Sequence, residues 1–212
     1  MNVEKTRRDI EAKRDRRHRD SVDPSVNGII AGVAERLHPS PVFITLSPAE
    51  AADPVLYDDL LDVWVAVIDA GGAVGFTAPA DRQAVARTLR GQLKRVREGR
   101  DALGVLRHAG RTLGMAFLVE SGSPLRRHWR TVLRVMVHPD LQGAGAGRLL
   151  LEGLHGVARD LGLEQLLLSV RGGTGTEGFY ERFGYVEIGR HPAAIRLAPD
   201  DDRDEIVMLL TL

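Results

Sequence analysis

Three glycines in a run of small residues are the part of this sequence whose types and spacing could do chemistry. Gly143, Gly145 and Gly147 lie between two apolar runs, one ending at Val137 and the other beginning at Leu149. Glycines between a strand and a helix let backbone N–H groups converge on a ligand, and the first turn of the helix adds roughly half a positive charge. The pattern therefore suits a diphosphate, although glycines also simply close corners between strands and helices.

Two other phosphate-binding motifs do not fit these glycines. A dinucleotide-binding fingerprint has Gly-x-Gly-x-x-Gly and an acidic residue about twenty positions later. This chain instead has Gly-x-Gly-x-Gly and Ser169 in that region. A P-loop needs a lysine, which is missing here. The sequence therefore does not support a nucleotide-binding regulator.

Periodicity and turn residues predict the elements that must position the glycine run. Residues 131–137 are rich in β-branched types and predict a central strand, and residues 145–161 predict the helix that follows the glycines. The remaining expected elements are a strand at 42–46, helices at 47–71 and 77–99, strands at 101–107, 112–120 and 165–170, a helix at 177–183, and strands at 185–190 and 205–210. This order predicts an α/β fold with a mixed sheet.

The glycine run belongs to a longer stretch with a family resemblance. Residues 135–150 read Val-Met-Val-His-Pro-Asp-Leu-Gln-Gly-Ala-Gly-Ala-Gly-Arg-Leu-Leu, which strongly resembles the acetyl-CoA motif of the GNAT superfamily, Gln/Arg-x-x-Gly-x-Gly/Ala. The resemblance continues through residues 166–171 and 177–185, and it covers roughly residues 42–212. It implies a GNAT-like mixed, mostly antiparallel sheet that is splayed at its fourth strand and flanked by helices.

The resemblance also implies a donor site and a reaction, N-acetylation with acetyl-CoA as the acyl-donor cosubstrate. The backbone of the fourth strand would bind the pantetheine arm through Val135, Met136 and Val137. The diphosphate would lie on the turn and the start of the helix, formed by Gln142, Gly143, Ala144, Gly145, Ala146, Gly147 and Arg148. Tyr180 would be the general acid that protonates the departing thiolate. A plain core tyrosine is the alternative for Tyr180, because aromatic residues surround it.

The attacking amine must lose a proton, and this requirement predicts a general base. A lysine-like amine with a pKa near 10.4 is about three units from its free base at pH 7. The candidates are Glu120, His128 and His138, of which we rank Glu120 first. Each has a simpler alternative: Glu120 facing solvent, His128 in a surface loop, and His138 shaping a turn. Ser169 stands where members that acetylate peptides often carry a glutamate base.

A second, looser resemblance concerns the acceptor. Residues 60–76 and the helix after them resemble tabtoxin-resistance-type acetyltransferases, which favours a small-molecule amine such as an antibiotic, a toxin or an amine metabolite. Trp64, Asp69 and Phe76 could line the opening for that acceptor, or could belong to the core. The alternatives are a protein N-terminal or lysine acetyltransferase and a non-catalytic acyl-CoA-binding module.

Composition limits the remaining possibilities. The chain of 212 residues predicts one acetyltransferase domain, residues 41–212, after a charged extension, residues 1–40, that is helical or loose. Because 29 basic residues balance 29 acidic ones, we expect no nucleic-acid partner, and the absence of cysteine and of clustered histidines argues against a metal site. Asp62 and Asp69 interrupt the most apolar stretch, so we expect no membrane span. We also expect a cytoplasmic protein, which could form a homodimer.

Overall fold

The computed structural model describes residues 40–212, so the extension predicted for residues 1–40 lies almost wholly outside the described residues. The described chain forms a seven-stranded sheet with the strand order β1-β2-β3-β4-β5-β7-β6. All neighbouring strands are antiparallel except β4 and β5. The strands are β1 (Val42–Thr45), β2 (Ala102–His108), β3 (Arg111–Val119), β4 (Trp129–Val137), β5 (Gln165–Arg171), β6 (Val186–Ala198) and β7 (Asp201–Thr211). This confirms the predicted mixed, mostly antiparallel sheet.

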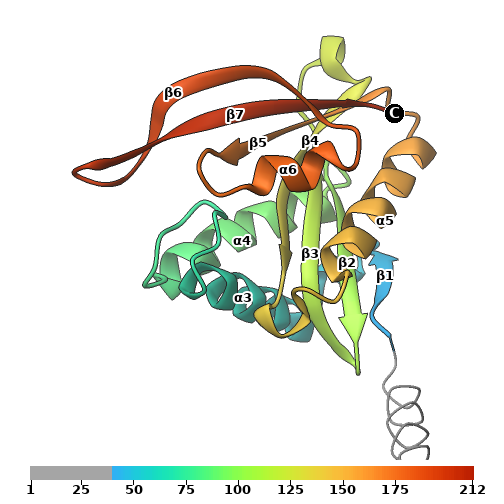
Figure 1. Cartoon of the computed structure of the whole chain (residues 1–212). Coiled ribbons are helices and arrows are strands. Elements are labelled where there is room, and N and C mark those ends of the chain that lie inside the picture. The colour runs from blue at the N-terminus through green and yellow to red at the C-terminus, as the bar shows by residue number, and fades with distance from the viewer. Residues whose placement is uncertain (1–39) are drawn as a thin grey trace, which may run out of the picture. The chain divides into compact units, whose positions relative to one another are not determined.

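Four α-helices flank the sheet, and they divide between its two faces (Figure 1). The helices are α3 (Pro54–Asp69), α4 (Arg82–Arg97), α5 (Ala146–Asp160) and α6 (Thr176–Glu181). Helices α3 and α4 pack on one face of the central strands, and α5 and α6 contribute to the core on the other face. The sheet therefore separates two hydrophobic cores.

The central strand β3 shows how alternating side chains serve both cores. Met115 and Phe117 are fully buried against α3 and α4, whereas Ala116 and Leu118 are fully buried in the core that contains α5. Successive side chains of a strand point to opposite faces, so a strand buried on both faces reads as one continuous apolar run. This explains why residues 112–120 carry so few polar side chains.

The first helix begins later than the sequence predicts. Ser47 and Glu50 cap each other through side-chain and backbone bonds, but they start only a short 3₁₀ turn, η1 (Glu50–Ala52). The α-helix begins after Asp53, whose side chain accepts from Val55 N at 2.9 Å, with Pro54 in the first turn. An aspartate cap followed by proline is the stronger start signal of the two.

The last two strands are longer than predicted. The sequence interpretation ended the first of them at residue 190, two residues before Pro192. In the structure β6 continues to Ala198, and its pairing with β7 is irregular between His191 and Ile195. Strand β6 lies at the edge of the sheet, where a proline need not remove a ladder hydrogen bond. Ala193 N instead donates to the Asp204 carboxylate at 3.1 Å.

Candidate active site

Strands β4 and β5 part in the middle of the sheet. Their parallel pairing runs only from Trp129 opposite Gln165 to Thr131 opposite Leu167. Beyond these residues, β4 continues beside β3 up to Val137, while β5 continues beside β7 up to Arg171. The edge of β4 that faces β5 therefore has no strand partner over residues 132–137. This is the predicted splay at the fourth strand, and it includes the backbone of the predicted pantetheine residues Val135, Met136 and Val137.

A β-bulge lies where the two strands separate. The register of β3 and β4 shifts between Met115, opposite Met136, and Phe117, opposite Leu133. Two β4 residues, Arg134 and Val135, therefore share one partner, Ala116. A bulge bends its strand and increases the local twist, which turns β4 away from β5. Arg134 has a φ of 60°, a left-handed conformation that is unusual for a residue with a side chain.

The glycine turn follows β4 directly. After the short 3₁₀ helix η3 (Pro139–Leu141), Gly143 and Gly145 both have a φ of 80°, and Gly145 is the N-cap of α5. A Cβ atom at either glycine would meet no other atom, so the backbone conformation and not a lack of space selects glycine. Residues 142–145 are exposed.

The start of α5 leaves backbone donors for a ligand. No side chain caps this helix in the described part of the chain, so the N–H groups of its first turn have no partner from a cap. They also lie at the positive end of the helix dipole. Exposed, uncapped N–H groups beside two left-handed glycines fit an anion such as a diphosphate.

The side chains of the turn have different tasks. Gln142 Nε2 donates to the carbonyl of Val137 at 3.0 Å, which ties the turn to the end of β4. Arg148 lies on the exposed side of α5, where its Nε is 2.8 Å from Glu152 Oε1. His138 Nδ1 accepts from Asp140 N at 3.3 Å, so His138 shapes the turn, as the simpler alternative for this residue had it.

Helix α6 brings Tyr180 close to the start of α5. The ring of Phe179 lies 3.7 Å from the point where a Cβ on Gly147 would stand, so α6 packs against the first turn of α5. The Tyr180 ring lies 5.2 Å from Phe179 and 5.5 Å from Tyr185, measured between ring centroids. Burial raises the pKa of Tyr180 to about 12, so its hydroxyl remains a proton-bearing donor at neutral pH.

The neighbouring tyrosine is different, because it has a protein partner. Tyr185 is 1% exposed, and its hydroxyl lies 3.1 Å from Nε2 of the buried His155. Burial lowers the pKa of His155 to about 4 and raises the pKa of Tyr185. Both groups are therefore neutral at pH 7 and form a hydrogen bond inside the core. His155, which the sequence gave no special role, is a structural residue.

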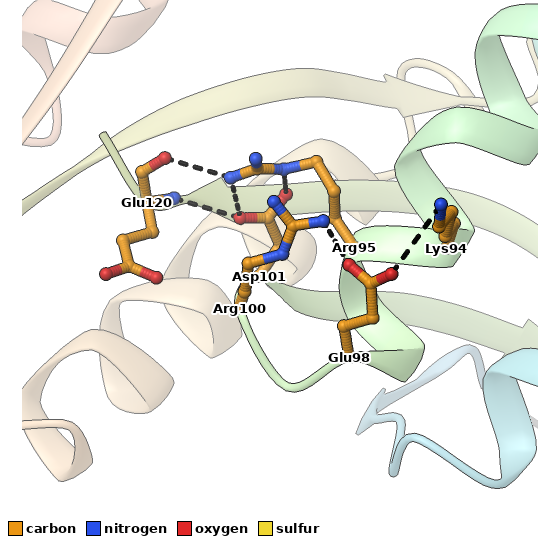
Figure 2. A network of polar contacts seen from close by, with 6 residues as sticks. All are labelled: Lys94, Arg95, Glu98, Arg100, Asp101 and Glu120. Atoms are coloured by element: carbon orange, nitrogen blue, oxygen red, sulfur yellow. Dashed lines mark hydrogen bonds and ion pairs between the residues drawn. The ribbon is translucent and has the colours of Figure 1, made fainter. Parts of the chain in front are cut away.

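Glu120 follows the end of β3 and belongs to a buried polar network (Figure 2). Its N–H donates to Asp101 Oδ1 at 3.0 Å, and its carbonyl accepts from Arg95 Nη2 at 2.9 Å. Figure 2 shows the Glu120 carboxylate pointing away from Arg95 and Asp101. The network thus fixes the backbone of Glu120 and leaves its side chain free to act elsewhere.

The structure does not bring Glu120 and Tyr180 into one hydrogen-bonded group. Val119 pairs with Thr131, the last β4 residue that also pairs with β5, so Glu120 follows β3 on the side where β4 and β5 are still paired. Tyr180 lies on α6, in the core that contains α5. His128 is exposed, and its carbonyl accepts from Glu164 N at 2.8 Å. Two of the three predicted base candidates, His128 and His138, thus have positions that their simpler alternatives explain.

The three residues considered for the acceptor opening support the fold instead. Trp64 is fully buried, and its Nε1 donates to the carbonyl of Val74 at 3.1 Å. Phe76 packs against the Trp64 ring at 5.7 Å, and Asp69 Oδ1 accepts from Ala80 N at 2.9 Å. Together they brace the segment between α3 and α4. For Trp64 the structure confirms the alternative of a core position, because no part of its side chain is accessible.

The sequence interpretation missed Arg134, which the structure places among these same residues. Its guanidinium lies 4.3 Å from the centroid of the Trp64 ring, and its Nη1 donates to the carbonyl of Val74 at 2.8 Å. An arginine inside a strand that otherwise reads Val-Leu-Arg-Val-Met-Val was the available signal, since charged side chains are rare in buried strands.

Two features are absent from residues 40–212. No group of three or more His, Cys, Asp or Glu side chains in this part of the chain could hold a metal ion. No helix within the same residues is long and apolar enough to cross a membrane.

Comparisons with known proteins agree with this geometry. The family model described as "Acetyltransferase (GNAT) domain" matches residues 99–187, which include β4, the glycine turn and α6. No curated protein matches the chain.

Solved structures share the fold. Ribosomal-protein-alanine N-acetyltransferase from Brucella melitensis has a TM-score of 0.64 at 20% identity, over 81% of this chain and 99% of that chain. The putative acetyltransferase yncA from Salmonella typhimurium, solved with its cofactor acetyl-CoA, has a TM-score of 0.64 at 19% identity, over 82% and 95%. A putative phosphinothricin N-acetyltransferase has a TM-score of 0.63 at 16% identity, over 82% and 99%. Residues 99–187 therefore match a GNAT acetyltransferase domain, and the described chain shares its fold with solved N-acetyltransferases, one of them with acetyl-CoA bound.

Proposed function

We propose that the domain, residues 41–212, transfers an acetyl group from acetyl-CoA to a primary amine of a small molecule. The observation that carries this proposal is the unpaired edge of β4 directly before an uncapped glycine turn. The edge offers backbone groups of Val135, Met136 and Val137 to an extended pantetheine amide chain. The turn offers its N–H groups to a diphosphate, and Arg148 adds a positive side chain.

The reaction needs one proton removed and one delivered. The amine nitrogen attacks the thioester carbonyl carbon, a C–N bond forms, and the C–S bond breaks with its electron pair going to sulfur. The amine gives up a proton to a base, and the sulfur takes one up. Tyr180 suits the second task as a hydrogen-bond donor, because its raised pKa keeps the hydroxyl protonated.

Complete proton transfer from Tyr180 would be uphill. A thiol has a pKa near 8.5, several units below the value of about 12 for Tyr180. We therefore propose that Tyr180 stabilises the developing thiolate by a hydrogen bond and keeps its own proton, so that CoA leaves as the thiolate and takes its proton from solvent.

Glu120 remains our candidate for the base. Its backbone is fixed by Arg95 and Asp101, and its carboxylate takes no part in that network. A base on a fixed backbone with a free side chain could accept the amine proton directly or through a water molecule.

A small acceptor is favoured by the braced segment between α3 and α4. Trp64, Asp69 and Arg134 each bond its backbone, so it has little freedom to move aside for a polypeptide. The likeness to a putative phosphinothricin N-acetyltransferase points in the same direction. The name of the Brucella melitensis protein keeps acetylation of a protein N-terminus as the alternative.

Calorimetric titration with acetyl-CoA tests the donor site. We expect binding in the micromolar range for the unchanged protein and at least a tenfold loss for Gly145→Glu, which puts a negative charge beside the diphosphate. Gly110→Glu is a matched control, since Gly110 also has a φ of 80° and open space around its Cβ position, but lies in the β2–β3 turn. Both variants carry the same backbone strain. Equal affinities of the two variants would refute the assignment of the turn.

A further inference from the structure

Arg134 is a charged residue built into a core position. The bulge gives it a left-handed φ of 60°, and its neighbours Leu133 and Val135 pack into the two cores. Positive φ is unfavourable for a residue with a side chain. Strain of this kind often gathers at functional sites, where the surrounding structure holds it in place.

The Arg134 guanidinium has no counter-ion in the described part of the chain. None of the salt bridges formed by residues 40–212 includes Arg134. Its Nε–H is buried without an acceptor, while Nη1 bonds only the neutral carbonyl of Val74. Burial lowers the pKa of Arg134 to about 10, so the group is still charged at neutral pH. A buried charge without a partner is costly, and an incoming anion would remove that cost.

The surrounding segment is shaped around this guanidinium. Gly75 has a φ of 91°, and a Cβ atom there would collide with Arg134 Nη1. Trp64 lies under the guanidinium plane at 4.3 Å, and the indole also bonds Val74. Glycine, indole and carbonyl thus hold the cation in one orientation, as expected for a group that must recognise a ligand.

A second arginine reaches the same segment from β5. Arg171 is the last residue of that strand, and its Nη2 lies 3.4 Å from the carbonyl of Gly71. Arg171 already has a nearby carboxylate, because it helps Arg203 to lower the pKa of Asp201. The two strands that part therefore each send an arginine to the segment between α3 and α4, and only Arg134 lacks an acidic neighbour.

We propose that Arg134 binds an oxyanion of the acceptor, so that the substrates are small amines that also carry a carboxylate or phosphoryl group. This inference rests on the proposed function. The glycine turn and α6 contribute to the face of the sheet with the α5 core, so the donor would enter the gap from there. Arg134 points to the other face, beside α3, from which an amine can approach the thioester. A fixed positive charge nearby would also lower the pKa of the bound amine and favour its reactive free base.

Matched acceptors test the proposal. The probes are pairs of α-amino acids and their carboxamides, and pairs of aminoalkyl phosphates and the corresponding amino alcohols, each assayed by the release of CoA thiol. We expect the unchanged enzyme to prefer the anionic member of at least one pair by about tenfold or more. Arg134→Gln should raise KM for that member about 10- to 100-fold and remove the preference. Arg134→Lys should keep part of it.

Controls separate recognition from folding. Arg82→Gln removes an arginine near the same segment, one that pairs with Asp62 on the surface, and should leave the preference unchanged. Acetyl-CoA affinity, measured by calorimetry, should be the same in all variants. A variant that loses acetyl-CoA binding is misfolded, and Arg134→Lys then decides the question.

Three outcomes are distinguishable. If the unchanged protein binds no acetyl-CoA, the proposed function fails. If it binds acetyl-CoA but acetylates neutral members as well as anionic ones, the inference about Arg134 is overturned and the function stands. If no probe is acetylated, ligand-observed NMR with the CoA-saturated protein replaces turnover, and equal binding of both members of every pair overturns the inference.

Discussion

Tyr180 and Tyr185 show how two tyrosines with touching rings come to different roles. Their ring centroids are 5.5 Å apart, and burial raises the pKa of both. The Tyr185 hydroxyl forms a hydrogen bond with His155 inside the core. The Tyr180 hydroxyl forms no hydrogen bond within residues 40–212, so it is available to a ligand. The presence of a protein partner, more than burial, separates the structural tyrosine from the catalytic candidate.

Replacement of each tyrosine by phenylalanine tests that distinction. Tyr180→Phe should lower kcat by about 100-fold and leave acetyl-CoA affinity unchanged, because only the donor to the departing sulfur is lost. Tyr185→Phe leaves His155 Nε2 unpaired, so it should lower the free energy of unfolding by about 1–3 kcal/mol with kcat retained. Steady-state kinetics and urea denaturation measure both. Full kcat in Tyr180→Phe would remove Tyr180 from the mechanism.

Residues that a local turn conformation requires could be predicted from the sequence. Residues whose role depends on contacts with distant parts of the chain could not. Gly143 and Gly145 are recognisable because their left-handed conformation is a demand of the turn itself. The role of Arg134 depends on Trp64, Val74 and Gly75, which lie about sixty to seventy residues earlier in the chain. It also depends on a β-bulge that no local sequence pattern indicates. For Trp64 the sequence allowed both the acceptor opening and the core, and only the packed structure shows that its indole is enclosed.

At the scale of elements, one polar network joins the end of α4 to the start of β2 and the end of β3. Arg95 Nε and Nη2 donate to the Asp101 carboxylate at 2.5 and 2.8 Å, and the Asp101 side chain is 1% exposed. These hydrogen bonds raise the pKa of Arg95. Because Asp101 also accepts from Glu120 N, the network sets where the backbone of Glu120 lies.

Asp101→Asn should break this junction. One amide group would face the Arg95 donors with its own N–H₂, and the Arg95 charge would lose its partner. We expect the free energy of unfolding to fall by about 2–3 kcal/mol, less than for a fully enclosed pair because Arg95 is partly exposed. Urea denaturation measures the change.

Two controls accompany that variant. Glu98→Gln removes an exposed carboxylate close to the same network and should change the free energy of unfolding by less than about 0.5 kcal/mol. Glu120→Gln should also leave stability unchanged, since the network uses only its backbone, but it should lower kcat if Glu120 is the base. A stability loss in Glu120→Gln equal to that of Asp101→Asn would contradict the view that its side chain is free.

Some element boundaries are set by local caps and others by strand pairing. The start of α4 after Asp81 follows from an aspartate that accepts from two backbone N–H groups. The extent of β6 past Pro192 follows from its place at the sheet edge and from β7, which lies later in the chain. In the sequence alone, Pro192 favours an end to the strand, and only the pairing with β7 shows that β6 continues.

Residues 40–212 form two cores that share one sheet, and the site lies where that sheet opens. The fold class could be predicted because each core leaves a pattern in the sequence, helical on α3 and α5 and alternating or continuous on the strands. The opening could not be predicted from periodicity alone, because no local pattern marks Thr131 and Leu167 as the last residues at which β4 and β5 pair. The family resemblance supplied that expectation, and the pairing register confirms it.

A buried titratable group makes the stability of the whole fold depend on pH. His155 has a pKa of about 4 in the folded protein because burial disfavours its charged form, against 6.5 for an ordinary histidine. Between these values the unfolded chain binds more protons than the folded one. The free energy of unfolding is therefore fully retained above pH 6.5 and falls as the pH drops toward 4, by at most about 1.4 kcal/mol per pH unit from this residue.

His155→Gln is the variant that isolates this effect, because glutamine can still bond the Tyr185 hydroxyl but does not titrate. Urea denaturation at pH 7.5, 6.0 and 5.0 should show a decline for the unchanged protein and a flatter profile for the variant. The variant can be less stable at every pH without affecting this test, since the slope and not the absolute value reports the proton. Parallel profiles for the two proteins would mean that His155 is charged in the folded state. In that case the core around α5 would have to admit water or a carboxylate, and the neutral hydrogen bond between His155 and Tyr185 would be wrong.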